Sequence, residues 1–135
     1  MSAPPPLLCL IIPAYNEGGR LPATLPPVFE FLEAQSYASE LIIVNNNSRD
    51  NTRDIALQFA ATRPYVQVID ERTQGKGAAV RTGMLAATGD YLFMADADFS
   101  MPVGEIAKFL PPRLGQYDVA IGSREAPGAV RYNEP

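Results

Sequence analysis

Short apolar runs alternate with helical patterns along this chain, and that alternation restricts its possible folds more than any other feature. Apolar runs without polar alternation are typical of strands that are buried on both faces of a parallel sheet. The expected strands cover residues 7–12, 40–44, 65–69, 90–95 and 117–121. The expected helices cover residues 26–35, 51–61, 77–87 and 103–110. This order predicts an α/β fold with a mostly parallel sheet, right-handed crossovers and helices on both faces.

Three kinds of residue mark the ends of these expected helices. Pro26 and Pro27 are placed at the start of the first helix, where a missing N–H is tolerated. Ser48 and Asn51 are N-cap candidates for the second helix, since their side chains can accept from unpaired backbone N–H groups. Gly89 is the expected C-cap of the third helix, because glycine readily adopts the left-handed conformation.

Length and composition exclude several classes of function. The chain has 135 residues, enough for a single domain over 1–135 with its own core. Its 11 basic and 15 acidic residues give a net charge of −4, with no basic face that would indicate nucleic-acid binding. It has no histidine, which excludes histidine-based acid/base catalysis and histidine metal sites.

The single cysteine and the apolar runs bear on the cellular compartment. Cys9 lies inside the run 7–12, which predicts a buried strand residue and no internal disulfide. This favours a reducing, cytoplasmic compartment. The same run is too short to span a bilayer and lacks a basic segment before it, so we expect neither a transmembrane helix nor a signal peptide.

Polar segments follow each expected strand, at the point where the strand ends. Ligands of parallel α/β sheets bind outside the carboxyl ends of the strands, so these segments form the candidate site. They are residues 13–17, 45–48, 70–76, 96–100 and 122–124. Each segment contains at least one charged or amide side chain that can bind a ligand.

Asp96 and Asp98 follow the fourth expected strand and indicate a metal site. Side chains two residues apart in an extended segment point the same way, so both carboxylates can converge on one point. Two close carboxylates repel each other unless a cation or a proton lies between them. Mg²⁺ or Mn²⁺ suits such oxygen ligands, and a diphosphate can complete the coordination. The alternative is a turn after a buried strand, with Asp98 capping the next helix.

Two other segments suit a nucleotide base. Tyr15 and Glu17 can present a ring and a carboxylate to a base, although the same residues also fit an ordinary turn. Asn45 and Asn46 can donate to and accept from a base edge, or they can form a turn and cap the following helix.

The segment 74–77 opens the third expected helix and suits a phosphate. Its glycines allow close approach to an anion, and a helix N-terminus favours negative charge. Lys76 and Arg81 add positive charge. The segment matches neither the Walker spacing nor GxGxxG, so its phosphate signal is weak when taken alone.

Four segments in this order resemble family 2 glycosyltransferases of the GT-A fold: IIPAYNE, VNNNSRDNT, QGKGAAVRTGMLAATGDYLFMADAD and IGSR. The third segment is most similar to the dolichyl-phosphate glucosyltransferase and polyprenyl-phosphate sugar synthase branch. The resemblance implies a Rossmann-like nucleotide-binding domain that transfers a hexose, with inversion, from a UDP- or GDP-hexose with Mn²⁺ or Mg²⁺. It further implies a polyprenyl phosphate acceptor and peripheral contact with the cytoplasmic face of a membrane.

The resemblance also implies roles for individual residues. Asp96 and Asp98 match the DxD motif that holds the divalent ion against the donor diphosphate. Arg124, in IGSR, is the third implied catalytic residue and is expected to meet the acceptor phosphate, or else to form a surface ion pair. The implied donor-binding residues are Pro13, Ala14, Tyr15, Glu17, Asn45, Asn46, Gly75, Lys76, Arg81, Asp96 and Ala97.

Two features depart from the family pattern. Asn45 and Asn46 stand where the family usually carries at least one acid, so a base would be bound without charge assistance. If Asn46 takes over that role, Asn46→Asp should tighten nucleotide binding by about 1 kcal/mol. Family members also continue well beyond the strand expected at 117–121. We therefore expect this chain to be the donor-binding half of a longer enzyme, truncated at its C-terminus.

Three other functions share part of these signals. Haloacid-dehalogenase-like phosphatases carry a similar acidic motif, but theirs follows the first strand and is accompanied by a later lysine and acidic pair. In this chain the motif follows the fourth expected strand. A nucleotidyltransferase would carry a glycine-rich loop after the first strand, where this chain has PAYNE. A non-catalytic nucleotide-sugar-binding module, or an inactive fragment, fits the same motifs, and only turnover separates it from an enzyme.

Overall fold

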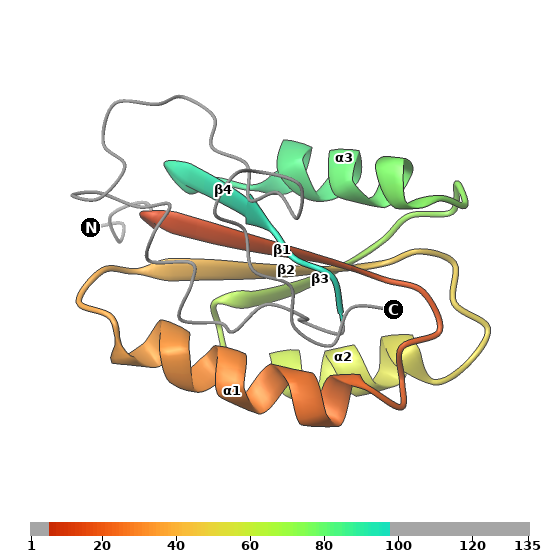
Figure 1. Cartoon of the computed structure of the whole chain (residues 1–135), viewed down its shortest axis with the longest axis horizontal. Coiled ribbons are helices and arrows are strands. Elements are labelled where there is room, and N and C mark those ends of the chain that lie inside the picture. Colours follow the sequence, from red (N-terminus) through yellow and green to blue (C-terminus); the bar gives the residue numbers. More distant parts are fainter. Residues whose placement is uncertain (1–5, 98–135) are drawn as a thin grey trace, which may run out of the picture. The chain divides into compact units, whose positions relative to one another are not determined.

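The computed structural model describes residues 6–97, in which strands and helices alternate (Figure 1). The strands are β1 (Leu8–Ala14), β2 (Ser39–Asn45), β3 (Val66–Asp70) and β4 (Tyr91–Met94). The helices are α1 (Leu21–Ala34), α2 (Thr52–Ala60) and α3 (Lys76–Ala86). The first four expected strands are confirmed, with ends shifted by one or two residues. The helix expected at 103–110 and the strand expected at 117–121 lie outside the described residues, so the single domain over 1–135 stays a prediction.

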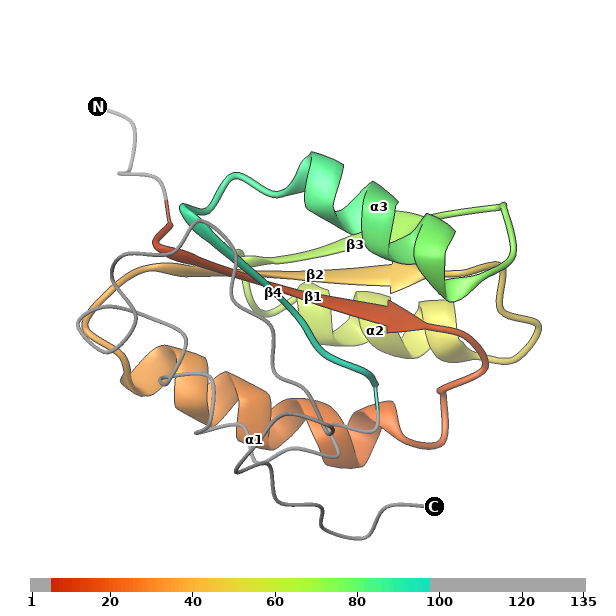
Figure 2. The same cartoon turned by 45° about the horizontal axis from the view of Figure 1, so that its top comes forward.

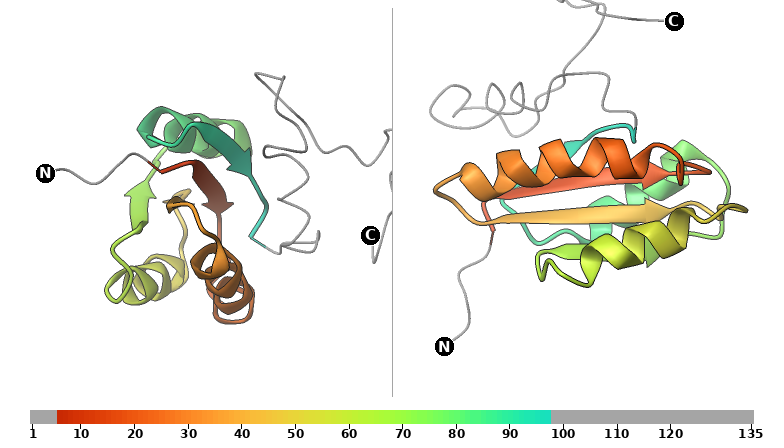
Figure 3. Two further views of the ribbon diagram at one scale, coloured as in Figure 1. Left: turned by 90° about the vertical axis from the view of Figure 1, so that its left-hand side faces the viewer. Right: turned by 90° about the horizontal axis from the view of Figure 1, so that it is seen from below.

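The four strands form one parallel sheet in the order β3-β2-β1-β4. Helices α1 and α2 lie on one face and α3 lies on the other, which confirms the expected layers (Figures 1 and 3). The chain moves outward from β1 to β3 and then returns to the other side of β1 for β4. The strand order therefore reverses at β1 and β4, and a crevice for a ligand is expected at their carboxyl ends.

The core lies along the two central strands, β1 and β2. Residues 8–12 and 41–44 are 0% exposed, because helices cover both faces of these strands. Cys9 and Ile11 pack with Ile42, Val44 and Ala79 beneath α3. Burial of Cys9 confirms the sequence expectation, and it raises the pKa of the thiol well above its usual range. Among residues 6–97, no helix combines the length and apolar character needed to cross a bilayer.

Helix α1 begins at Leu21, five residues before the expected start at Pro26, so the predicted start was wrong. Pro22 lies in the first turn, where a backbone N–H has no helical partner anyway. Pro26 and Pro27 lie inside the helix, and each removes one backbone hydrogen bond. Burial of one continuous apolar stripe offsets this loss, at about 1.5–3 kcal/mol for each large side chain. The stripe consists of Leu21, Leu25, Val28, Phe29 and Leu32.

The helix caps also differ from expectation. Helix α3 ends at Ala86 with Ala87 as its C-cap, so Gly89 is not the cap. Gly89 instead lies against β1, where an added Cβ would come within 2.9 Å of the Cys9 backbone nitrogen. Asn51 holds the N-cap position of α2 but makes no side-chain capping hydrogen bond. The Thr52 N–H donates to Asp50 Oδ1 instead, at 2.9 Å.

Candidate functional site

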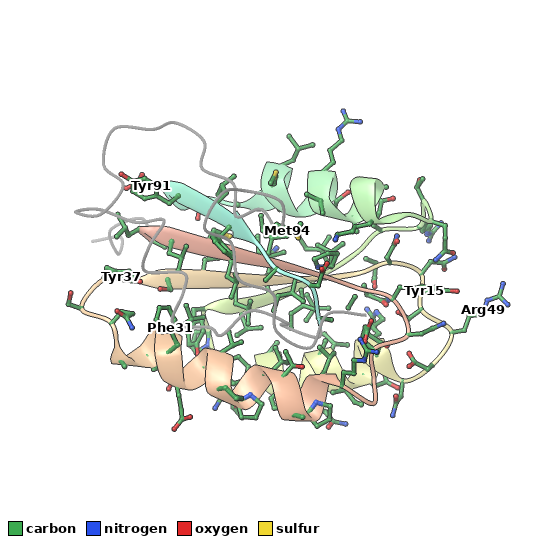
Figure 4. The ribbon with its side chains drawn as sticks, in the orientation of Figure 1. Tyr15, Phe31, Tyr37, Arg49, Tyr91 and Met94 are labelled. Carbon is green, nitrogen blue, oxygen red and sulfur yellow. The ribbon has the colours of Figure 1, made fainter. Side chains whose placement is uncertain are left out.

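The loops at the carboxyl edge of the sheet enclose a cleft of about 450 Å³, at the switch point between β1 and β4. Figure 2 shows the loops after β1, β2 and β3 gathered at this end, where α3 begins. Figure 4 shows Tyr15 and Arg49 projecting from this edge, while Tyr37 and Tyr91 lie at the opposite one. The cleft is lined by Pro13, Ala14, Tyr15, Glu17, Arg20, Asn46, Gln74, Gly75, Lys76, Asp96 and Ala97.

Most of the residues that the sequence predicts to bind the donor thus lie in one cleft. Asn45 and Arg81 do not line it: Asn45 is buried at the end of β2, and Arg81 lies exposed further along α3. Asp98 and Arg124 lie outside the described residues. Arg20 lines the cleft without having been predicted. The sequence signal for Arg20 would have been its position three residues after Glu17, a spacing at which opposite charges can pair. In the structure the Glu17 carboxylate lies 3.5 Å from Arg20 Nε.

Asn16 joins the loop after β1 to the loop after β2. It has a φ of 52°, a left-handed conformation that asparagine tolerates better than most residues. Its N–H donates to Ser48 Oγ at 3.0 Å, and its Oδ1 accepts from the Arg49 N–H at 2.8 Å. The two loops are therefore fixed to each other, which holds neighbouring Tyr15 at the cleft.

Asp50 and Thr52 make the second connection between these loops. The Gly18 N–H donates to Asp50 Oδ2 at 3.2 Å, and the Glu17 N–H donates to Thr52 Oγ1 at 2.8 Å. The Thr52 hydroxyl also donates to Asp50 Oδ1. These donors favour the charged carboxylate and lower the pKa of Asp50, with the Thr52 hydroxyl as the largest cause.

Asp50 is expected to make stability depend on acid. Its folded-state pKa is lowered, so its contribution is complete above the unfolded aspartate pKa of about 3.9 and is lost as the pH falls through the folded value. Asp50→Asn should therefore be less stable than wild type near neutral pH, and the difference should narrow in acid. Urea unfolding at two pH values measures this, with exposed Asp90→Asn as the control. If the difference in unfolding free energy between wild type and Asp50→Asn grew in acid, the lowered pKa of Asp50 could not be its cause.

Asn46 connects β2 to the loop between β3 and α3. Its Nδ2 donates to the carbonyls of Glu71, at 3.1 Å, and Thr73, at 2.7 Å. Its Oδ1 accepts from the Gly75 N–H at 2.9 Å. The side chain lies at the cleft but is only 4% exposed. Both hydrogens of the Asn46 amide are therefore donated to the loop between β3 and α3.

Asn45 makes a related contact to the end of β3. Its Nδ2 donates to Asp70 Oδ1 at 3.0 Å, and its Oδ1 accepts from the Ser48 N–H at 3.3 Å. Asp70 also pairs with Arg53, at 3.1 Å between Nε and Oδ2. The Asn45 amide, followed by Arg53, lowers the pKa of Asp70. The carboxylate of Asp70 thus lies at the end of β3, beside position 45 at the end of β2, where the family resemblance leads one to expect an acid.

Lys76 and Asp96 meet across the cleft, with Lys76 Nζ 2.7 Å from Asp96 Oδ1. Both side chains are about half exposed, so the pair contributes little to stability but remains accessible to a ligand. Lys76 follows Gly75, whose φ of 125° suits only glycine. A carboxylate at the strand end, beside a lysine that suits a phosphate, fits a hard divalent cation bound together with a diphosphate. Among the described residues, no three acidic or cysteine side chains cluster as a complete metal site.

The comparison with known families decides which kind of protein carries this cleft. The sequence profile of glycosyl transferase family 2 matches residues 9–135. The chain belongs to glycosyl transferase family 2. This finding confirms the resemblance drawn from the four sequence motifs.

Curated relatives of this family 2 chain are longer than it is. A dolichyl-phosphate beta-glucosyltransferase of Drosophila melanogaster is 37% identical over 133 residues, covering 87% of this chain and 40% of the relative. An undecaprenyl-phosphate 4-deoxy-4-formamido-L-arabinose transferase of Pseudomonas syringae pv. syringae is 35% identical over 127 residues, covering 92% of this chain and 35% of the relative. The chain therefore spans two fifths or less of the length of these two relatives.

A solved structure supports the fold of the family 2 chain. A mannosyltransferase from Pyrobaculum calidifontis, determined with GDP-Man and Mn²⁺, superimposes with a TM-score of 0.60 at 29% identity. The match covers 70% of this chain and 28% of that protein. Together with the parallel sheet and its two helical layers, it confirms the expected GT-A architecture.

Proposed function

We propose that the cleft binds the nucleoside diphosphate part of a sugar donor together with Mn²⁺ or Mg²⁺. In this proposal the chain takes part in transferring a hexose, with inversion, from a UDP- or GDP-hexose to a polyprenyl phosphate. The observation that carries the proposal is the meeting of Lys76 and Asp96 in the cleft at the switch point of the sheet. The polyprenyl-phosphate and dolichyl-phosphate transferases among the relatives support the choice of acceptor.

In this proposal, different residues of the cleft bind different parts of the donor. Tyr15, 45% exposed, offers its ring to the base, and Lys76 offers its charge to the diphosphate. Asp96, with Asp98, would hold the divalent ion. When bound, that ion supplies positive charge against the diphosphate leaving group. Donor positioning and charge stabilisation are then the main tasks of this half of the site.

A phosphate acceptor does not need a histidine base, and these 135 residues contain no histidine. The second pKa of a phosphate monoester is about 6, so its oxygen is already ionised near neutral pH and can attack without a general base. The acceptor oxygen forms a bond to the anomeric carbon as the bond to the diphosphate breaks, and the electron pair leaves with the diphosphate. Arg124 is the residue we propose for the acceptor phosphate, and the cytoplasmic membrane face is the place where donor and acceptor meet.

Calorimetry with UDP and GDP tests the donor site, with Mn²⁺ and with a chelator. We expect one nucleotide to bind at least about tenfold more tightly with the metal, equal to about 1.4 kcal/mol. Sugar transfer to a short-chain polyprenyl phosphate then tests the reaction. Equal binding in metal and in chelator would contradict the donor site. Metal-dependent binding without transfer is the result expected of the donor-binding half alone, whereas metal-dependent binding without transfer by an extended protein would favour a nucleotide-sugar-binding module instead.

A further inference from the structure

We infer that Asn46 is a positioning residue, which holds the turn of residues 74–76 so that Lys76 meets the donor diphosphate. This inference rests on the proposed donor site, and it assigns Asn46 a role other than reading the base. It also reverses the expectation that Asn46→Asp tightens nucleotide binding.

The partners of the Asn46 side chain fix its orientation. The Glu71 and Thr73 carbonyl oxygens can only accept hydrogen bonds, so they must face Nδ2, which has two hydrogens. The Gly75 N–H can only donate, so it must face Oδ1. Both amide hydrogens are thereby used inside the protein. A base could receive no hydrogen from Asn46, and would meet only the second lone pair of a nearly buried oxygen.

The same residue ties three parts of the edge together through its backbone. The Asn46 N–H donates to the Ala14 carbonyl at 2.8 Å, and the Asn46 carbonyl accepts from Gln74 Nε2 at 3.2 Å. Gly75 is therefore fixed in its unusual conformation directly before Lys76, which begins α3. Lys76 then reaches Asp96. A loss of the Asn46 contacts would release the turn from which Lys76 extends.

An amide suits position 46 and a carboxylate does not. A carboxylate there would place one oxygen against the two carbonyl oxygens of Glu71 and Thr73, with no hydrogen between them. An amide suits position 45 for the same reason, because a carboxylate there would lie against the carboxylate of Asp70 and be repelled by it. Asn45 and Asn46, which replace the acids of the family pattern, thus both donate hydrogen bonds to acceptor groups at or after the end of β3.

Asn46→Asp, compared with Asn47→Asp, tests the inference. Asn47 is the next residue, is exposed, and makes no side-chain hydrogen bond to the loop in the described part of the chain, so its variant repeats the change of charge without touching the loop. Its φ of 58° is a left-handed conformation, which asparagine and aspartate both visit. The probes are UDP, GDP and inorganic pyrophosphate, each with Mn²⁺. We expect Asn46→Asp to weaken pyrophosphate and nucleotide binding by the same factor, about fivefold or more, and Asn47→Asp to have little effect.

A double-mutant cycle separates positioning from a general loss of structure. If Asn46 acts through Lys76, Asn46→Asp should have little further effect on pyrophosphate binding in a Lys76→Met background. An equal loss in both backgrounds would overturn the inference, as would a loss for nucleotides but not for pyrophosphate. Tighter binding by Asn46→Asp would also overturn it. If Asn46→Asp does not fold, Asn46→Ser replaces it in the same cycle.

Hydrogen exchange at the Gly75 amide gives a readout without any ligand. We expect this amide to exchange slowly in the wild-type chain and faster in the Asn46 variants, because Oδ1 of Asn46 accepts its hydrogen. Fast exchange in the wild type would overturn the positioning role by itself. Absence of pyrophosphate and nucleotide binding in the wild type would instead overturn the donor site, while slow Gly75 exchange would still support the hold on the turn.

Discussion

Asp96→Asn is expected to remove the metal dependence of nucleoside diphosphate binding. The variant keeps the size of the side chain but loses the charge that a hard cation needs in a ligand. It also breaks the ion pair with Lys76. The metal-dependent part of the affinity should fall by about ten- to a hundredfold, as expected for charged contacts of about 1.5–3 kcal/mol. Calorimetric titration with Mn²⁺ and with a chelator measures both parts of the affinity.

Asp90→Asn is the matched control for this measurement. Asp90 directly precedes β4 and is exposed, whereas Asp96 follows the same strand at the opposite, carboxyl edge of the sheet. The control variant should bind the nucleotide with the metal dependence of the wild type. If Asp96→Asn also kept that dependence, the ion would have to bind elsewhere, and the assignment of Asp96 would fail.

The sequence predicted the sheet well because its two central strands, β1 and β2, are apolar on both faces. Such runs have few alternatives to a buried strand, and their spacing leaves room for one helix in each crossover. The start of α1 was predicted too late because prolines usually mark a helix start. Burial of Leu21 and Leu25, both 0% exposed, extends the helix past that signal toward its N-terminus. Tertiary packing therefore decided a boundary that local propensity placed elsewhere.

The candidate site was predictable in its membership but not in its contacts. Lys76 and Asp96 could be assigned to one edge, because both belong to segments near the carboxyl ends of parallel strands. Their pairing required β4 to lie beside β1, which no local pattern contains. The partners of Asn46 were also out of reach, because they lie on a loop 25 to 29 residues further along the chain. An amide that holds a loop and an amide that reads a base have the same sequence pattern.

Gly83→Ala is expected to destabilise the fold, although alanine is normally the better helix former. Gly83 lies in α3 directly over the sheet, where an added Cβ would come within 2.5 Å of Ile11 Cγ2 and 3.1 Å of Val44 Cγ2. Ile11 and Val44 are both 0% exposed, so neither side chain has room to move away. Overpacking of this kind costs about 1–3 kcal/mol, and it should lower the melting temperature by several degrees.

Gly77→Ala in the same helix provides the opposite case. An added Cβ at Gly77 meets nothing within 4 Å, so only the helix preference remains, and stability should rise by up to about 1 kcal/mol. The two identical substitutions should therefore shift the melting temperature in opposite directions. Thermal unfolding followed by circular dichroism measures both. If Gly83→Ala stabilised the chain as much as Gly77→Ala, α3 could not approach β1 as closely as the contact with Ile11 requires.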